Sequence, residues 1–305
     1  MNDPRQTRIC IVGGDGAVGG ALVARFREKG VECLASTRRE LSDPNTQFRL
    51  DLSNRDEIAL PVCDVVILAA AMARLAECRA DPDLARRVNV DAQIRLAENA
   101  RSFGAIVIFL STALVFDGTR PNVAPEEAPS PRSLYGKLKA ETEAALLGSG
   151  AEVAIIRLGK VIGRHLQLFE RWRQELSSGR TVEAFDDLVI APIALSTVAS
   201  GIESIVHQRA KGVWHLCGKE DISYFDAARH LAHRVGGDEK LVCRMSAAVA
   251  GIPEEERPPH TALALGNIEE FFDVKIRNAK SEIDIGLDLH PHSSNVPDLL
   301  FQRSS

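Results

Sequence analysis

Short, uninterrupted apolar segments recur along the first half of the chain, and amphipathic stretches separate them. The apolar segments are residues 9–12, 65–68, 106–110 and 153–156. Runs this short and this apolar are typical of parallel strands that are buried on both faces. Strands that alternate with helices predict an α/β fold, a Rossmann-type doubly wound parallel sheet.

Two of the separating stretches have helical spacing. Val18, Leu22 and Phe26 fall on one face of the first. In the stretch between the second and third apolar segments, apolar residues recur every four positions: Leu84, Val88, Ala92, Leu96 and Ala100. A stripe of this kind predicts a long helix that faces the sheet.

The alternation weakens beyond about residue 160 and returns briefly at residues 212–217. We therefore expect a Rossmann domain over residues 1–160, with a returning segment near residues 190–217. A smaller, interleaved C-terminal α/β lobe is expected over residues 161–190 and 218–305. The tail from about Leu287 is expected to be poorly ordered.

Composition and charge narrow the classes of partner. The 305 residues carry a net charge of −5, which argues against a nucleic-acid partner because phosphate binding favours a clustered basic face. No apolar run approaches the ~20 residues of a membrane span, and the polar start lacks a secretory core, so we expect a cytoplasmic protein without a membrane partner. Six scattered cysteines and two isolated histidine pairs have no metal-ligand spacing, so no metal site is expected.

A glycine-rich turn joins the first strand to the first helix. Its residues are Gly13-Gly14-Asp15-Gly16-Ala17-Val18-Gly19. Gly13 allows a sharp turn, Gly16 allows a pyrophosphate to approach the backbone, and Gly19 allows close packing of helix and strand. A turn without a ligand would give the same pattern, but a strand before it and a helix after it favour a dinucleotide bound at the helix start. The expected cofactor contacts here are Gly13, Gly16, Ala17, Val18 and Gly19.

The end of the second strand carries two arginines, Arg38 and Arg39, where an acid commonly binds the ribose 2′-hydroxyl of NAD. Guanidinium groups can bind a 2′-phosphate through paired, charge-assisted hydrogen bonds. This favours NADP(H) over NAD(H). The alternative is that both arginines lie on a solvated loop.

Tyr135 and Lys139 are four residues apart at the start of a predicted helix, so they share one face. A nearby ammonium is expected to lower the pKa of the phenol, which could then exchange a proton with a carbonyl oxygen while a cofactor delivers hydride. Thr112 follows the strand at residues 106–110, at the sheet edge where ligands of such folds bind. An exposed Tyr–Lys pair and a turn-capping threonine are the structural alternatives.

With these residues in place, the chain resembles the extended short-chain dehydrogenase/reductases, and among them the branch similar to dTDP-4-dehydrorhamnose reductase. The matching stretches are the glycine turn, Asp51-Leu52-Ser53, Ala69-Ala70-Ala71-Met72, Asn89-Val90, Ser111-Thr112, Val115-Phe116-Asp117-Gly118, Tyr135, Lys139, Ile156-Arg157-Leu158, Val161-Ile162-Gly163, Ala191-Pro192-Ile193, Gly212-Val213-Trp214-His215-Leu216 and Arg257-Pro258. The resemblance spans roughly residues 8–285.

The resemblance implies a catalytic triad of Thr112, Tyr135 and Lys139, with Tyr135 and Lys139 also beside the cofactor. It implies that Asp51 and Leu52 border the adenine and that Ala69, Ala70 and Ala71 line the cofactor's path. It also implies a nucleotide-linked sugar as substrate, bound by the C-terminal lobe. We consider a homodimer as the assembly.

Two departures bear on the substrate. Ala113 stands where the reductases usually carry an acid, and Gly159-Lys160 replaces an aromatic residue after the sixth strand. The leading hypothesis is an NADPH-dependent reductase of a keto group on a nucleotide sugar or a similar small substrate. The alternatives are an NAD-dependent nucleotide-sugar epimerase and a noncatalytic NAD(P)-binding regulatory subunit.

Overall fold

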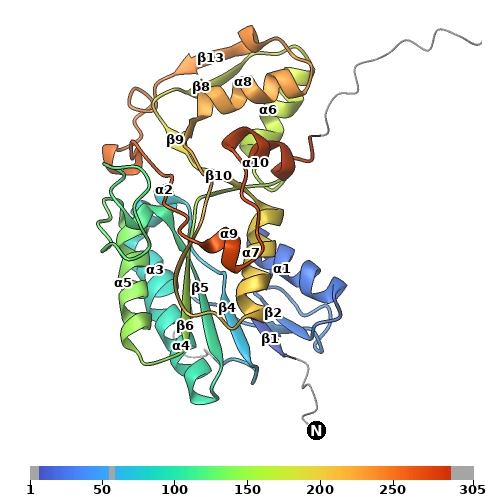
Figure 1. The fold of residues 1–305 in the computed structure, drawn as a ribbon, viewed down its shortest axis with the longest axis vertical. Helices are drawn as coiled ribbons and strands as arrows, with labels where there is room; N and C mark the ends of the chain where they lie inside the picture. Colours follow the sequence, from blue (N-terminus) through green and yellow to red (C-terminus); the bar gives the residue numbers. More distant parts are fainter. Residues whose placement is uncertain (1–6, 55–58, 290–305) are drawn as a thin grey trace, which may run out of the picture.

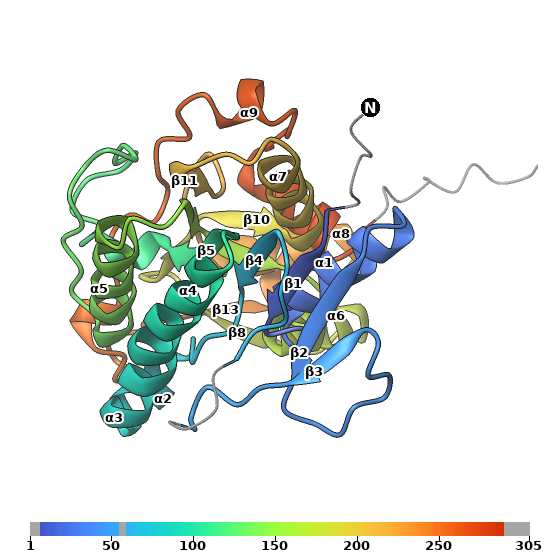
Figure 2. The same ribbon diagram turned by 90° about the horizontal axis from the view of Figure 1, so that it is seen from below.

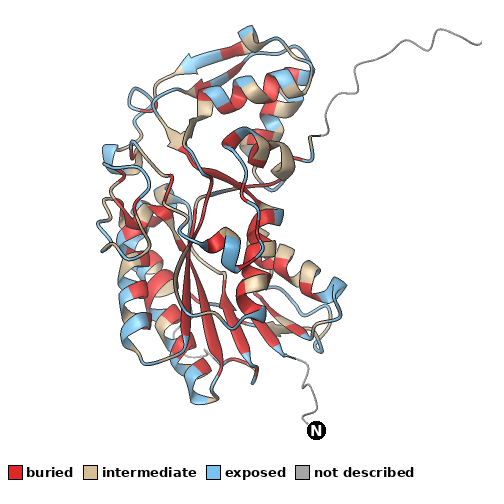
Figure 3. Cartoon of the chain, viewed as in Figure 1, coloured by how far each residue is buried: buried red, intermediate tan, exposed pale blue. Residues whose placement is uncertain are grey.

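A parallel sheet forms the centre of the molecule. The computed structural model describes residues 7–54 and 59–289, and within them the sheet has seven strands in the order β11-β6-β5-β4-β1-β2-β3. The strands are β1 (Ile9–Val12), β2 (Cys33–Thr37), β3 (Gln47–Arg49), β4 (Val65–Leu68), β5 (Ile106–Thr112), β6 (Val153–Leu158) and β11 (Gly212–Leu216). The central strands are buried (Figure 3), which explains their continuous apolar sequence. The predicted fold class is confirmed.

Helices cover both faces of the sheet (Figures 1 and 2). On one face, α1 (Ala17–Glu28) and α7 (Leu195–His207) pack through a core that includes Leu22, Phe26 and Ile202. On the other, α4 (Ala92–Ser102) and α5 (Leu134–Gly148) pack through a core that includes Leu96 and Leu146. β1 and β4 are neighbours at the middle of the sheet, and the chain continues from β1 toward one edge and from β4 toward the other, so the space at their carboxyl ends is open to a ligand.

The long helix predicted by the stripe from Leu84 to Ala100 is interrupted. It consists of α3 (Pro82–Arg86), a π-helical turn (Arg87–Asp91) and α4. The turn buries Asn89, whose side chain donates to the Met72 carbonyl at 3.0 Å and accepts from the Met72 amide at 2.9 Å. The π-turn thus ties this helix to the segment after β4, a role that π-turns often have near functional sites.

A smaller lobe lies beyond the carboxyl ends of the strands (Figure 1). Its elements are β8 (Val182–Phe185), β9 (Val189–Ile190), β12 (Ile222–Ser223), β13 (Val242–Met245), α6 (Gln167–Ser177), α8 (Tyr224–Arg234) and α10 (Ala279–Gly286). Phe169, Trp172 and Leu231 belong to its own buried core. The parallel pair β7 (Lys160–Ile162) and β10 (Pro192–Ala194) connects the lobe to the sheet.

Short helices complete the described structure. These are α2 (Leu75–Ala80), α9 (Ile268–Phe271) and 3₁₀ turns at Ala113–Val115, Glu239–Leu241 and Glu254–Glu256. No helix within the described ranges is long and apolar enough to cross a bilayer. The tail from about Leu287 is expected to be poorly ordered. Residues 290–305 of that tail lie outside the described part of the chain, so the expectation stays a prediction.

Candidate active site

The glycine turn has the backbone geometry that its sequence predicts. Gly13 has φ +98°, and a Cβ there would lie 2.7 Å from the Ala70 nitrogen. A Cβ on Gly19 would lie 2.1 Å from the Gly13 oxygen, so a side chain at either position would displace the backbone. The first-turn amides of α1 have no intrahelical acceptor and mark a place for an anion, which fits the diphosphate of a dinucleotide.

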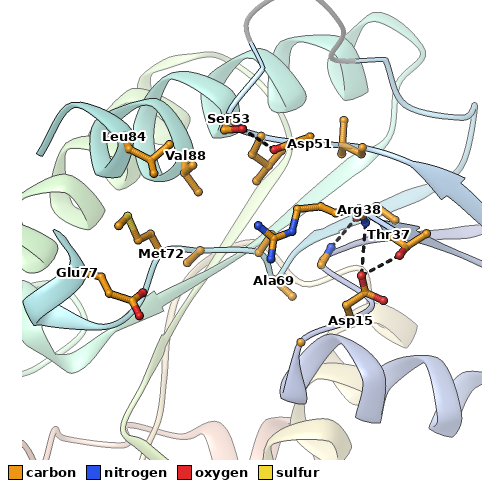
Figure 4. A pocket seen from close by; sticks show the side chains of 17 residues that line it. Asp15, Thr37, Arg38, Asp51, Ser53, Ala69, Met72, Glu77, Leu84 and Val88 are labelled. Atoms are coloured by element: carbon orange, nitrogen blue, oxygen red, sulfur yellow. Dashed lines mark hydrogen bonds between the residues drawn. The ribbon is translucent and has the colours of Figure 1, made fainter. Parts of the chain in front are cut away.

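A cavity of about 560 Å³ opens beside this turn (Figure 4). Gly13 and Gly16 line it together with Arg38, Asp51, Leu52 and the segment Ala69 to Ala71. The arginine side chain of Arg38 extends across the cavity toward Ala69. Hydrogen bonds from Ser53, and more weakly the charge on Arg38, hold the pKa of Asp51 below its ordinary value. Charges of both signs therefore meet at this end.

Two predicted cofactor contacts, Gly19 and Arg39, line neither this cavity nor the second one that continues from it. Gly19 is buried against the turn, where it permits close packing without facing the space. Arg39 is exposed, and its backbone amide donates to the Thr37 hydroxyl at 3.0 Å. Of the two arginines, Arg38 is therefore the one placed to meet a ligand.

A second cavity, of about 480 Å³, continues from the first. Gly16, Ala69 and Ala71 line both cavities, so the two meet beside the glycine turn. The predicted residues that line the second cavity are Ala17, Val18, Thr112, Tyr135 and Lys139. The two cavities together form an elongated space suited to a dinucleotide and a second ligand.

The start of α5 positions Tyr135 and Lys139. Ser133 caps the helix by accepting from the Gly136 amide at 3.1 Å. A Cβ on Gly136 would lie 2.1 Å from the Leu114 oxygen, so the glycine lets the helix approach the end of β5. Thr112 accepts from the Leu114 amide at 3.2 Å, which means that it caps a turn as well as lining the cavity.

Burial decides the protonation of the pair. Burial raises the pKa of Tyr135 above its ordinary value and lowers the pKa of Lys139 to about 7. The expectation that Lys139 lowers the pKa of the phenol is therefore wrong for the cofactor-free protein. The ammonium donates to the Leu110 carbonyl at 2.6 Å and lies 6.0 Å from the centroid of the tyrosine ring, so desolvation outweighs its attraction for a phenolate.

A buried ion pair lies beneath the site. The Arg157 guanidinium donates to the Glu143 carboxylate at 2.8 Å, and the Ser111 hydroxyl donates to the same carboxylate. Arg157 also donates to His215 Nε2 at 3.2 Å. Burial lowers the pKa of His215 to about 4, so the imidazole is neutral and its Nδ1 donates to the Ala264 carbonyl at 2.9 Å. The network joins β5, α5, β6 and β11 directly below Thr112 and Lys139.

Several lining residues were not predicted. Asp15 and Glu77 line the first cavity, while Tyr224, Glu256 and Thr261 line the second. Asp15 is a polar residue inside the glycine turn, and the other four come from a loop, short helices or the first turn of α8, so none of them has a pattern that predicts a functional role. Glu256 also links two distant segments of the chain, because its carboxylate accepts a hydrogen bond from Arg79 Nε of α2 at 2.6 Å.

Comparisons with known proteins agree with this geometry. The model of the family described as "RmlD substrate binding domain" matches residues 7–289. A dTDP-4-dehydrorhamnose reductase of Sinorhizobium fredii is 28% identical over 287 residues, which cover 89% of this chain and 93% of that protein. The methionine adenosyltransferase 2 subunit beta of Bos taurus is 28% identical over 244 residues, covering 76% and 73%.

Solved structures share the fold. A dTDP-4-dehydrorhamnose reductase from Bacillus anthracis in complex with NADP superposes with a TM-score of 0.77 at 17% identity, covering 92% of this chain and 98% of that one. MoeE5 in complex with UDP-glucuronic acid and NAD also has a TM-score of 0.77, at 20% identity and with 92% and 97% covered. The sequence-based resemblance is confirmed, and so is the class of NAD(P)-dependent oxidoreductase.

Proposed function

This chain belongs to the RmlD substrate binding domain family of extended short-chain dehydrogenase/reductases, and on that premise we propose that it reduces a keto group on a nucleotide-linked sugar with NADPH. The observation that carries the proposal is the meeting of the two cavities. Thr112, Tyr135 and Lys139 line one, and it shares Gly16, Ala69 and Ala71 with the other, which follows the glycine turn. A hydride donor along the turn would thus lie beside the three side chains.

Tyr135 supplies the proton in this proposal. Its raised pKa keeps the phenol protonated at neutral pH, which is the state that a reductase needs in its general acid. The bound nicotinamide would supply hydride to the carbonyl carbon. The Tyr135 hydroxyl proton then passes to the carbonyl oxygen, and the Thr112 hydroxyl donates a hydrogen bond to the same oxygen.

Lys139 holds the ribose next to the nicotinamide and supports the phenolate that remains after proton transfer. With a pKa of about 7, it holds its proton for part of the time at neutral pH in the free protein. A phenolate formed nearby would favour the charged ammonium. The contacts proposed for the rest of the cofactor are Gly13, Gly16, Ala17, Val18, Arg38, Asp51, Leu52, Ala69, Ala70 and Ala71, whereas Gly19 shapes the turn and Arg39 lines neither cavity.

Arg38 underlies the proposed preference for NADP(H). Its guanidinium crosses the first cavity and is the cation among the described residues that line it. A 2′-phosphate beside it would accept charge-assisted hydrogen bonds. The carboxylate of Asp15, which accepts from the Thr37 hydroxyl at 2.8 Å, lies at the same end of the cavity. The attraction of Arg38 for the 2′-phosphate must therefore exceed the repulsion by Asp15.

The substrate class follows from the relatives and from the second cavity. One relative is named for a dTDP-linked sugar, and a structural neighbour holds UDP-glucuronic acid. We propose that residues 161–190 and 218–305 form the substrate lobe, because Leu188, Val189, Ile190 and Tyr224 line the cavity opposite Thr112. A cytoplasmic location and a homodimer complete the proposal.

Replacing Tyr135 by Phe tests the mechanism. The change removes the transferable proton and retains the ring, so kcat should fall by about 10²–10⁴-fold while the Kd for NADPH stays within two-fold. Steady-state kinetics and calorimetry measure the two quantities. Tyr224→Phe, which removes the chain's other phenol from the same cavity, should keep kcat within ten-fold. Retained turnover in the Tyr135 variant would require another proton donor.

The methionine adenosyltransferase relative supports a second candidate, a subunit that binds the cofactor without turning over a sugar. Calorimetric binding of NADPH with no turnover of any nucleotide-linked keto sugar would favour that candidate. Purification with NAD already bound would favour the epimerase alternative instead. If neither NADPH nor NADH binds, all three functions are excluded.

A further inference from the structure

Lys160 lines the second cavity together with Thr112, Tyr135 and Lys139. It begins β7, and its amide donates to the Ala191 carbonyl at 2.9 Å, which fixes the backbone there. Leu158 pairs in register with Thr112, and Lys160 follows two residues later. At about 3.3 Å per residue, its backbone is therefore held roughly 7 Å along the chain from the position opposite Thr112.

The charge on Lys160 is not balanced by the protein. Its ammonium has no ion pair or hydrogen bond among the residues that the structure describes, and it lines the cavity with an exposed side chain. The acidic residue in the lining, Glu256, is already paired with Arg79. Lys139 is the other cation there. The cavity therefore presents positive charge without a matching carboxylate.

A neighbouring group responds to this charge. Burial, and then the charge on Lys160, lower the pKa of His165. Arg257, next in sequence to the lining residue Glu256, does not line the cavity and is already occupied, because it donates to the Ile252 carbonyl at 3.0 Å and faces Asp187 at 3.9 Å. Lys160 is thus the exposed cation of the second cavity that is left for a ligand.

We propose that Lys160 binds a carboxylate on the sugar ring of the substrate, so that the substrate is an acidic nucleotide sugar. This inference rests on the proposed function and adds the substrate class. A carboxylate next to the reacting carbon would reach Lys160 while the carbonyl faces Thr112 and Tyr135. The diphosphate of a nucleotide sugar is the other anion that a lysine could bind, and the experiment separates the two.

The test is calorimetry on the full chain saturated with NADP⁺. The ligands are UDP, UDP-glucose and UDP-glucuronic acid, together with their thymidine counterparts. The unaltered protein should bind the glucuronic acid form about ten-fold more tightly than the glucose form, as expected for one charge-assisted hydrogen bond. Lys160→Met should abolish that preference while its affinities for the diphosphate and the glucose form stay within two-fold.

Two further variants serve as controls. Lys160→Arg should keep the preference because the charge remains. Lys240→Met removes a lysine from an exposed turn outside both cavities and should also keep it. Two results would overturn this inference and leave the proposed function standing. One is equal affinity of the unaltered protein for the two sugars, and the other is a loss of affinity for the diphosphate in Lys160→Met that equals the loss for the glucuronic acid form. If NADP⁺ binds but none of the nucleotide ligands does, the sugar-nucleotide substrate of the proposed function fails.

Discussion

The two cavities use charge in different ways. The charged side chains that line the first are exposed to solvent: Arg38, Asp15, Asp51 and Glu77. Three charges at and below the second, Lys139, Glu143 and Arg157, are each 2% exposed, whereas Lys160, which also lines it, is exposed. Exposed charges interact weakly through water, so they can bias which ligand binds with little effect on stability. Buried charges depend on their partners, so they fix geometry and couple the site to folding.

The largest expected effect tests the buried side of this comparison. Glu143→Gln should lower the free energy of unfolding by about 3–5 kcal/mol, because Arg157 would keep a buried charge without its counterion. Denaturant unfolding measures the loss. Glu141 lies two residues away on the same helix and pairs with Arg86 at an exposed position. Glu141→Gln should cost at most about 1 kcal/mol, and equal losses in the two variants would contradict the contrast.

The exposed side of the comparison predicts a change in ligand choice instead. Arg38→Ala should weaken NADPH binding by about 10–100-fold, as for one or two charge-assisted hydrogen bonds, and leave NADH binding within two-fold. Asp15→Asn should have the opposite sign and strengthen NADPH binding, since a carboxylate would no longer face the 2′-phosphate.

Arg39→Ala is the matched control because Arg39 does not line the cavity. Calorimetry with both cofactors gives the ratio of affinities for each variant, and thermal unfolding should be nearly unchanged in all three. If Arg39→Ala lost the preference for NADPH and Arg38→Ala kept it, the phosphate contact would belong to Arg39, and its assignment to Arg38 would be wrong.

The two cavities also differ in how much of each could be predicted from the sequence. The first is built largely from continuous motifs: the glycine turn, the end of β2, Asp51-Leu52 and Ala69 to Ala71. Glycine spacing predicts the turn, and the position after the second strand predicts Arg38, whereas Asp51-Leu52 and Ala69 to Ala71 are expected only from the family resemblance. Periodicity predicts the sheet and the shared face of Tyr135 and Lys139. Asp15 was missed because a polar residue inside such a turn has no pattern of its own.

The second cavity depends on distant contacts. Glu256 reaches it through an ion pair with Arg79, 177 positions away in the sequence. Burial of the Tyr–Lys pair arises from distant elements, and no local pattern gives its extent. Tyr135 packs in a cluster with Cys78 of α2, and the Lys139 ammonium lies 4.2 Å from the centroid of the Phe109 ring of β5. The sequence therefore predicted which residues share a helix face but gave the wrong direction for the pKa of Tyr135, since desolvation depends on tertiary packing.

The smallest expected effect concerns the pH dependence of stability. Lys139 has a pKa of about 7 in the folded protein, against an ordinary value of 10.5 in an unfolded chain. Between these values the unfolded chain binds the proton more tightly, so unfolding takes up a proton and becomes less favourable as the pH rises. The penalty from burying Lys139 is fully present below pH 7 and is relieved as the pH approaches 10.5.

Lys139→Met removes this dependence. From pH 7 to pH 8, the free energy of unfolding of the unaltered protein should rise relative to that of the variant by about 1 kcal/mol, close to the limit of ~1.4 kcal/mol per pH unit. Urea unfolding at both pH values on the cofactor-free proteins measures the difference. Lys137→Met changes an exposed lysine of the same helix and should show no such trend. A difference that stays flat or falls with pH would mean that Lys139 remains charged when buried, and the charge of the second cavity would then be as independent of folding as that of the first.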